Sequence, residues 1–257
     1  MTREDIVTGF VTDPERLYFD TTASRKNAKN AKHPSGPTGK GRGEPQEKEM
    51  PGGRIRAKAL VVIGSSTGGP SALEKLMRYM SPDIPAGLVI VQHMPVGFTV
   101  SLAARLHRLS PIPIREAMEG DVVRNGEALV APGGRHLIVA SDGTVTIDFG
   151  PPVNGVRPSV DVTLKSAVEA YGDKVVAVIL TGMGSDGAAG ALAVRRAGGR
   201  VFVQDEESSV VWGMPRAVIE TAGADVILPP EYMPLYILTA VRSLLTRAPG
   251  DTEEVKG

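Results

Sequence analysis

From residue 55 onward, short apolar runs alternate with longer segments in which apolar residues recur every three or four positions. The short runs are rich in β-branched residues, which is typical of strands buried inside a parallel sheet. The longer segments have the spacing of amphipathic helices. This alternation predicts an α/β fold, a doubly wound and mostly parallel sheet with helices on both faces. We expect strands at 59–63, 87–92, 174–180, 200–204 and 225–228, and helices at 71–80, 98–109, 159–171, 188–197, 214–222 and 230–247.

One region, 114–149, breaks this rhythm and is more extended. Two apolar runs within it, 137–140 and 144–149, flank Ser141-Asp142-Gly143. An Asp-Gly pair between such runs is a strong hairpin signal, so we expect an antiparallel hairpin at one edge of the sheet. Downstream of it, Ser159 precedes a predicted helix and has the side chain of an N-cap residue.

Polar segments flank the predicted domain. A short mixed piece, 6–19, is followed by a polar run, 21–53, that is rich in Lys, Gly, Pro, Ser and Asn. This run has too few apolar side chains to offset the entropy of ordering them. We expect a flexible, polar, basic tail over 1–55, a single folded domain over 56–247, and a frayed C-terminal tail over 248–257.

Composition narrows the classes of protein further. Equal numbers of basic and acidic side chains, 29 of each, give zero net charge, so nothing global favours a nucleic-acid partner. The absence of cysteine excludes disulfides, a thiolate nucleophile and cysteine-ligated metal sites. The sequence shows neither a signal-peptide core nor the roughly 18 consecutive apolar residues of a membrane span. We therefore expect a cytoplasmic protein that does not insert into a membrane.

The first predicted strand ends in a glycine-rich turn that leads into a helix. Gly64, Ser66 and Gly68 match the pattern G-x-S-x-G, which in α/β-hydrolases places a nucleophilic serine between a strand and a helix. Pro70 suits the first turn of the helix that follows. The pattern is short, however, and a tight turn whose serines merely cap the helix would satisfy it equally well.

Ser66, His93 and Asp186 each follow a predicted strand, so a parallel sheet would bring all three to the same edge. Serine needs a base to act as a nucleophile at neutral pH, and histidine has the pKa for that role. A carboxylate would hold the imidazole in the right tautomer. The three residues therefore predict an acyl-transfer triad, although the chain order Ser-His-Asp differs from that of α/β-hydrolases.

Backbone N–H groups would complete such a site. Those of Thr67 and Gly68, at the start of the helix, and those of the loop around Met183 are suitable donors for an oxyanion. Simpler interpretations exist as well, because the histidine of the triad could be a hydrogen-bonded structural residue and Asp186 could only cap a helix. His136, in a loop, is the one serious rival for the base.

A second glycine-rich loop indicates a different function. Gly182, Gly184 and Gly187 spell G-x-G-x-x-G between a strand and a helix, and Asp205 follows the next strand near the position of a ribose-binding carboxylate. This alternative is a nucleotide- or NAD-binding oxidoreductase. Against it, Asp186 would place a negative charge where the pyrophosphate should bind. Neither glycine loop ends in G-K-[ST], which excludes a P-loop.

Several separate stretches of the chain together resemble a known family. They are Ile63-Gly64-Ser65-Ser66-Thr67-Gly68-Gly69-Pro70, Val91-Gln92-His93-Met94-Pro95, Gly97-Phe98-Thr99, Ala131-Pro132-Gly133-Gly134 with His136, Arg157-Pro158-Ser159-Val160-Asp161, Leu180-Thr181-Gly182-Met183-Gly184-Ser185-Asp186-Gly187 and Gly213-Met214-Pro215. Spread over about residues 58 to 230, they are similar to the catalytic domain of the chemotaxis receptor methylesterases, the CheB family.

The resemblance implies a catalytic domain over 56–247 in which Ser66 is the nucleophile, His93 the base and Asp186 its orienting acid. It implies protein-glutamate methylesterase activity on the cytoplasmic helices of methyl-accepting chemotaxis receptors, where γ-glutamyl methyl esters are hydrolysed, with deamidation of glutamines as a second activity. Thr67, Gly68 and Met183 would line the site. Neither a metal nor an organic cofactor is implied.

Most members of this family carry an N-terminal phosphoacceptor receiver domain, and residues 1–55 are too few and too polar to form one. We therefore expect a catalytic domain lacking the receiver. Either a separate receiver protein regulates it, or it is constitutive, or the chain is a divergent or incomplete form. A non-catalytic receptor-binding module with the same fold is a further alternative. It would leave unexplained why all three triad positions are filled.

Overall fold

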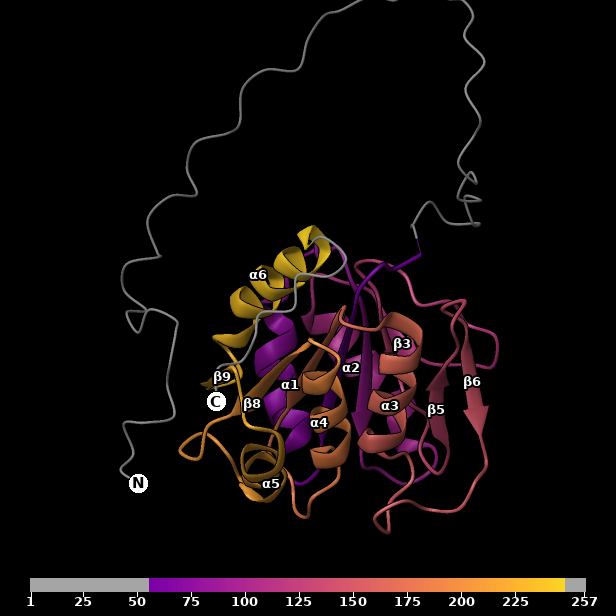
Figure 1. Ribbon diagram of the computed structural model, residues 1–257. Coiled ribbons are helices and arrows are strands. Elements are labelled where there is room, and N and C mark those ends of the chain that lie inside the picture. Colours follow the sequence, from indigo (N-terminus) through magenta and orange to yellow (C-terminus); the bar gives the residue numbers. More distant parts are fainter. Residues whose placement is uncertain (1–55, 248–257) are drawn as a thin grey trace, which may run out of the picture. The chain divides into compact units, whose positions relative to one another are not determined.

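Seven parallel strands form the central sheet of the described part of the chain (Figure 1). A computed structural model describes residues 56–247, and the predicted tails, 1–55 and 248–257, lie outside the described residues. Across the sheet the strands follow the order β3-β4-β2-β1-β7-β8-β9. Their bounds are β1 Leu60–Ser65, β2 Gly87–Gln92, β3 Ile114–Glu116, β4 Ala128–Val130, β7 Val175–Ile179, β8 Arg200–Gln204 and β9 Val226–Leu228.

Side chains along each strand alternate between two hydrophobic cores, one on each face of the sheet. In β1, Leu60 and Val62 belong to one core, whereas Val61 and Ile63 belong to the other. The first core is covered by α3, α4 and α5 and the second by α1, α2 and α6 (Figure 1). The helices are α1 Gly69–Arg78, α2 Phe98–Leu109, α3 Val160–Tyr171, α4 Ala188–Arg196, α5 Gly213–Ala222 and α6 Met233–Thr246.

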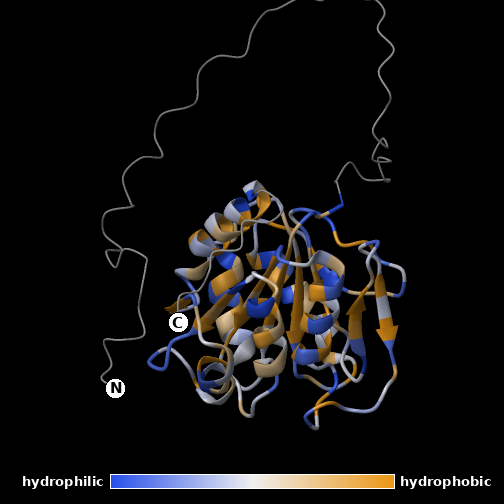
Figure 2. Cartoon of the chain, viewed as in Figure 1, coloured by the Kyte–Doolittle hydropathy of each residue, from blue (hydrophilic) through white to orange (hydrophobic). Residues whose placement is uncertain are grey.

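Apolar residues dominate the strands, and polar residues lie on the outer sides of the helices (Figure 2). This distribution is what a sheet buried on both faces requires. The predicted doubly wound fold is therefore confirmed. None of the described helices has the length and apolar character that crossing a membrane requires.

The predicted hairpin is also confirmed, as β5 (His136–Val139) and β6 (Val145–Asp148). It forms a separate two-stranded antiparallel sheet rather than extending the large one. Its buried side packs on α3, where Leu137 shares a core with Val160 and Leu164 and its carbonyl accepts the hydroxyl of Thr163 at 2.8 Å. Burial against α3 thus holds the hairpin beside the main sheet (Figure 1).

The order of the strands reverses at β1, which makes β1 the switch point of the sheet. From β1 the chain continues through α1 to β2 on one side, whereas β7 lies on the other side of β1 and leads to α4 on the opposite face. In open α/β sheets, ligands bind outside the carboxyl ends of the strands at such a switch point. The loops that follow β1, β2 and β7 meet there.

A glycine in β1 lets the start of α3 approach the carboxyl end of this strand closely. A Cβ atom on Gly64 would lie 2.6 Å from Cγ1 of Val160, the first residue of α3, which is far inside van der Waals contact. The close approach brings the N-terminal N–H groups of α3 to the carboxyl edge of the sheet. A larger residue at position 64 would push them away.

Replacing Gly64 with Ala should therefore lower the free energy of unfolding by about 1–3 kcal/mol, the usual cost of overpacking a core. Urea unfolding would measure this loss. The double variant Gly64→Ala/Val160→Ala should recover part of it, because the overlapping methyl groups are gone. If the two single losses simply add, the steric explanation is wrong.

Candidate active site

Ser66 and His93 are neighbours because β1 and β2 are paired. The last register pair of these strands is Ser65 opposite Gln92, so Ser66 and His93 occupy the next position, where adjacent strands lie about 4.8 Å apart. The N–H of His93 donates to the Ser65 carbonyl over 3.1 Å. Since successive side chains alternate, Ser65 and Gln92 face α1, whereas Ser66 and His93 point toward the α3 side.

On the α3 side, His93 is paired with Asp186. Its Nε2 lies 2.8 Å from Oδ2 of Asp186, and the exposed fractions of the two side chains are 10% and 3%. An ionised carboxylate only accepts hydrogen bonds, so Nε2 must be the donor, and the neutral ring carries its proton there. The lone pair of Nδ1 is then the basic position of the ring.

Asp186 is a buried carboxylate surrounded by hydrogen-bond donors. Besides His93, these are the Ser159 hydroxyl at 2.7 Å, the N–H groups of Val160 at 2.6 Å and Asp161 at 3.2 Å, and the Asn154 amide at 3.2 Å. Burial would raise the pKa of Asp186, but the hydrogen bonds from His93, Ser159 and the α3 backbone outweigh it and hold the pKa below its ordinary value. Asp186 is therefore ionised at neutral pH.

The carboxylate of Asp186 caps α3 and not the helix that follows it in the chain. Ser159 occupies the N-cap position of α3, as predicted, but the prediction that its side chain caps the helix is wrong. Its hydroxyl donates to Asp186, and the first N–H groups of α3 bind the same carboxylate. Negative charge at a helix N-terminus is favourable, so α3 stabilises the ionised form of Asp186.

The N-terminus of α4 is capped in return by Asp161, from the first turn of α3. One oxygen of Asp161 accepts the N–H groups of Gly187 at 3.0 Å and Gly190 at 2.7 Å. These groups would have to bind the pyrophosphate of a dinucleotide, and a carboxylate already occupies them. Asp205, the candidate ribose ligand, accepts hydrogen bonds from Ser208. The geometry thus argues against the oxidoreductase alternative.

The turn after β1 and the loop after β7 enclose Ser66. Its N–H donates to the Thr181 carbonyl at 3.0 Å, and a Cβ atom on Gly182 would lie 2.8 Å from the Cβ of Ser66. Within residues 56–247 the Ser66 hydroxyl has no hydrogen-bond partner, and the N–H groups of Thr67 and Gly68 donate to no acceptor. The hydrogen-bonding capacity of these groups is therefore unused within the described residues.

His136, the rival base, is held by structural hydrogen bonds. Its side chain is buried, Nδ1 accepts the N–H of Ser159 at 3.2 Å, and Nε2 donates to the Pro151 carbonyl at 3.0 Å. With both ring nitrogens engaged, His136 has no free lone pair with which to act as a base.

Asn154 also belongs to the site, although no sequence motif points to it. Its amide bridges two carboxylates, that of Asp161 at 2.9 Å and that of Asp186 at 3.2 Å. Asn154 is the one non-glycine residue among 56–247 with a positive φ, 53°. No local sequence pattern predicts this role for Asn154. Asp161, in contrast, lies in one of the stretches that carry the family resemblance.

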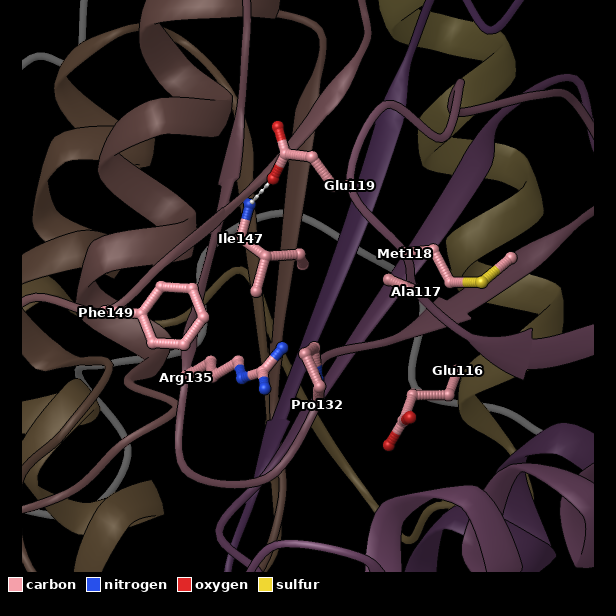
Figure 3. Close-up of a pocket in the computed structure, with 8 residues that line it drawn as sticks. All are labelled: Glu116, Ala117, Met118, Glu119, Pro132, Arg135, Ile147 and Phe149. Carbon is pink, nitrogen blue, oxygen red and sulfur yellow. Dashed lines mark hydrogen bonds between the residues drawn. The ribbon is translucent and has the colours of Figure 1, made fainter.

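A cleft of about 330 Å³ is lined by residues at the ends of β3 and β6 and in the segments that follow β3, β4 and β6, and none of Ser66, His93 and Asp186 lines it (Figure 3). Arg135 places its guanidinium 4.5 Å from the centre of the Phe149 ring, and Glu119 accepts the N–H of Ile147 at 2.7 Å. The cleft is lined by Glu116, Ala117, Met118, Glu119, Pro132, Arg135, Ile147 and Phe149. Nowhere in 56–247 do three or more His, Asp or Glu side chains gather in a way that could hold a metal ion.

The sequence pattern of the CheB methylesterase family matches residues 61–237. The chain belongs to this family. Over 194 residues it is 48% identical to a protein-glutamate methylesterase/protein-glutamine glutaminase of Symbiobacterium thermophilum, covering 76% of this chain and 51% of that relative. A second enzyme of that name, from Xanthomonas campestris, is 48% identical over 186 residues, with 71% and 53% covered.

A solved structure supports the same assignment. The crystal structure of the Thermotoga maritima CheB methylesterase catalytic domain is 46% identical and superposes with a TM-score of 0.68, covering 70% of this chain and 97% of that domain. The chain thus spans about half the length of the curated CheB relatives it matches and nearly all of the solved catalytic domain.

The depressed pKa of Asp186 makes the stability of the fold depend on pH. A carboxyl with a lowered folded pKa stabilises the protein fully above its unfolded pKa, about 3.9, and this contribution is lost as the pH falls through the folded value. Asp186→Asn should lower the free energy of unfolding by about 1–3 kcal/mol at neutral pH, and the difference from wild type should shrink below about pH 4.

Urea unfolding at about pH 7 and about pH 3 would measure both effects. The matched control is Asp83→Asn, because Asp83 is exposed and its substitution should change stability by less than about 0.5 kcal/mol. A loss in Asp186→Asn that is the same at both pH values would contradict the proposed charge.

Proposed function

We propose that this chain hydrolyses γ-glutamyl methyl esters on the cytoplasmic helices of methyl-accepting chemotaxis receptors. The observation that carries the proposal is the His93–Asp186 pair, whose His93 stands opposite Ser66 just beyond the last register pair of β1 and β2. This geometry supplies a base, its orienting acid and a hydroxyl. Membership of the CheB methylesterase family and the names of the relatives support the substrate class.

In the proposed reaction the Ser66 hydroxyl attacks the ester carbonyl, and Nδ1 of His93 takes the hydroxyl proton. Ionised Asp186 stabilises the resulting imidazolium through Nε2. The free N–H groups of Thr67 and Gly68, with those of the loop around Met183, would hold the oxyanion. His93 then returns the proton to the departing methoxide, which leaves as methanol.

The same groups then hydrolyse the acyl-enzyme, with His93 and Ser66 exchanging a proton in the opposite direction. A water molecule gives one proton to His93 as it attacks the acyl carbonyl, and Ser66 recovers that proton when its bond to the acyl group breaks. The products are the glutamate side chain and the free serine. We also propose deamidation of glutamine, in which ammonia replaces methanol as the leaving group, because the relatives carry glutaminase in their names.

The most direct test of this function is Ser66→Ala. Methanol release from methylated receptor should fall by about three orders of magnitude or more, since only binding and the oxyanion groups remain. The matched control is Ser71→Ala, an exposed serine of α1 whose replacement should leave turnover unchanged. Near-normal methanol release by Ser66→Ala would exclude the proposed nucleophile.

An apolar rim around the site fits a macromolecular substrate. Several large hydrophobic side chains are exposed on segments that follow strands at the carboxyl edge: Val96, Phe98, Met118, Phe149, Met183 and Val210. Exposed apolar surface concentrated at one place marks an interaction site. The rim is suited to the apolar residues that flank an ester on a receptor helix.

Met183, 76% exposed in the loop beside Ser66, is the rim residue to test. Met183→Ser should raise KM for methylated receptor by about three- to tenfold, because roughly 1 kcal/mol of apolar burial is lost. The rate of inactivation by a small serine-directed phosphonate should change less. Tyr79→Ser is the control, since Tyr79 is similarly exposed, at 61%, but follows α1 at the opposite edge. Equal effects of both variants on KM would show that the rim does not contribute to substrate binding.

A further inference from the structure

Gln92 ends β2 directly beneath the site and has no role in the reaction described so far. Its side chain is buried, with 2% exposed, and every hydrogen-bonding atom of its amide is used. Nε2 donates to the carbonyls of Ser66 at 2.9 Å and of His93 at 3.1 Å, and Oε1 accepts the hydroxyl of Ser65 at 2.7 Å. One NH2 group thus binds the backbone of both residues that the proposed mechanism requires to react.

The orientation of this amide follows from its partners. Carbonyl oxygens can only accept hydrogen bonds, so the NH2 group must face Ser66 and His93, and Oε1 must face the donating hydroxyl of Ser65. The surroundings are tight as well, because a Cβ atom on Gly69 would lie 2.0 Å from Oε1 of Gln92. The amide is therefore locked below the turn that leads from β1 into α1.

This contact lies where the sheet stops holding the two strands together. Ser65 opposite Gln92 is the last register pair of β1 and β2, and beyond it one chain enters the turn to α1 and the other the loop to α2. The Ser66 N–H is tied to β7's loop through the Thr181 carbonyl. The Gln92 amide links the backbone carbonyl of Ser66 to that of His93.

We propose that Gln92 is a positioning residue that sets the distance between the nucleophile and the base by holding both backbone carbonyls on one amide. This inference rests on the proposed function of Ser66 and His93. Small misplacements of reacting groups cost much rate, and a shift of about 1 Å can lower it about a hundredfold. Loss of the amide should therefore act on the chemical step and not on substrate binding.

Gln92→Met tests this role, because methionine has a similar length and volume but no donor. If Gln92 has a positioning role, kcat for methanol release should fall by about 10- to 100-fold and KM should change by less than about threefold. The rate of inactivation by a serine-directed phosphonate should fall by a similar factor, because that reaction needs Ser66 and its base but no receptor.

The matched control is Gln204→Met. Gln204 ends β8, is equally buried, and uses its amide in the same way, accepting the Thr181 N–H at 2.8 Å and donating to the Ser208 carbonyl at 2.9 Å. It contacts neither Ser66 nor His93 directly, and it binds the Thr181 N–H rather than the Thr181 carbonyl that holds Ser66. Both variants should lose similar thermal stability, but Gln204→Met should keep kcat within about threefold of wild type. Equal losses of kcat in both, or wild-type kcat in Gln92→Met, would overturn the proposal.

If Gln92→Met does not fold, Ser65→Ala carries the test. This variant removes the donor that fixes Oε1, and kcat should fall by about three- to tenfold with KM unchanged. Wild-type kcat in a folded Ser65→Ala protein would overturn the role. Failure of the proposed function is distinguishable, because wild-type protein would then react with the phosphonate but release no methanol, and the phosphonate rates would still decide the role of Gln92.

Discussion

The burial of one carboxylate, Asp186, constrains the whole site. A buried charge is costly unless donors surround it, and here the donors come from His93, from Ser159 and from the first N–H groups of α3. The arrangement requires α3 to begin close to the carboxyl edge of the sheet, which Gly64 in β1 permits. Asp161, on the same turn of α3, in turn caps α4. Two helices and the His93 ring are thus fixed around a pair of carboxylates.

The alternation of side chains along the strands divides the site into two layers. Ser65 and Gln92 belong to the face covered by α1 and form a buried hydrogen-bonded layer. One residue further along each chain, Ser66 and His93 belong to the opposite face, where Asp186 lies. The same period of two that sorts valines and leucines into two cores therefore also separates the supporting groups from the proposed reacting groups.

Much of this organisation could be predicted from sequence, because apolar runs locate buried strands and the residues after them must meet at one edge. That reasoning selected the three residues Ser66, His93 and Asp186 from the ends of β1, β2 and β7, and the bounds of β2 and α2 agree with the structure. The sequence does not predict the short strands β3 and β4 within the extended region 114–149, because three-residue strands carry too little periodicity.

Side-chain partners were harder to predict than elements. Ser159 lies where a cap belongs but donates to a residue 27 positions away, and Asn154 and Gln92 bind groups that no local pattern connects to them. The contact between Asp186 and His93 is also of this kind: ionised Asp186 holds the proton of neutral His93 on Nε2 and leaves Nδ1 as the base. Nitrogen NMR of isotopically labelled protein tests it most directly, with the His93 signals assigned by their loss in His93→Gln. We expect a protonated Nε2 and an unprotonated Nδ1 in the neutral ring, and a proton on Nδ1 would contradict the role of Asp186.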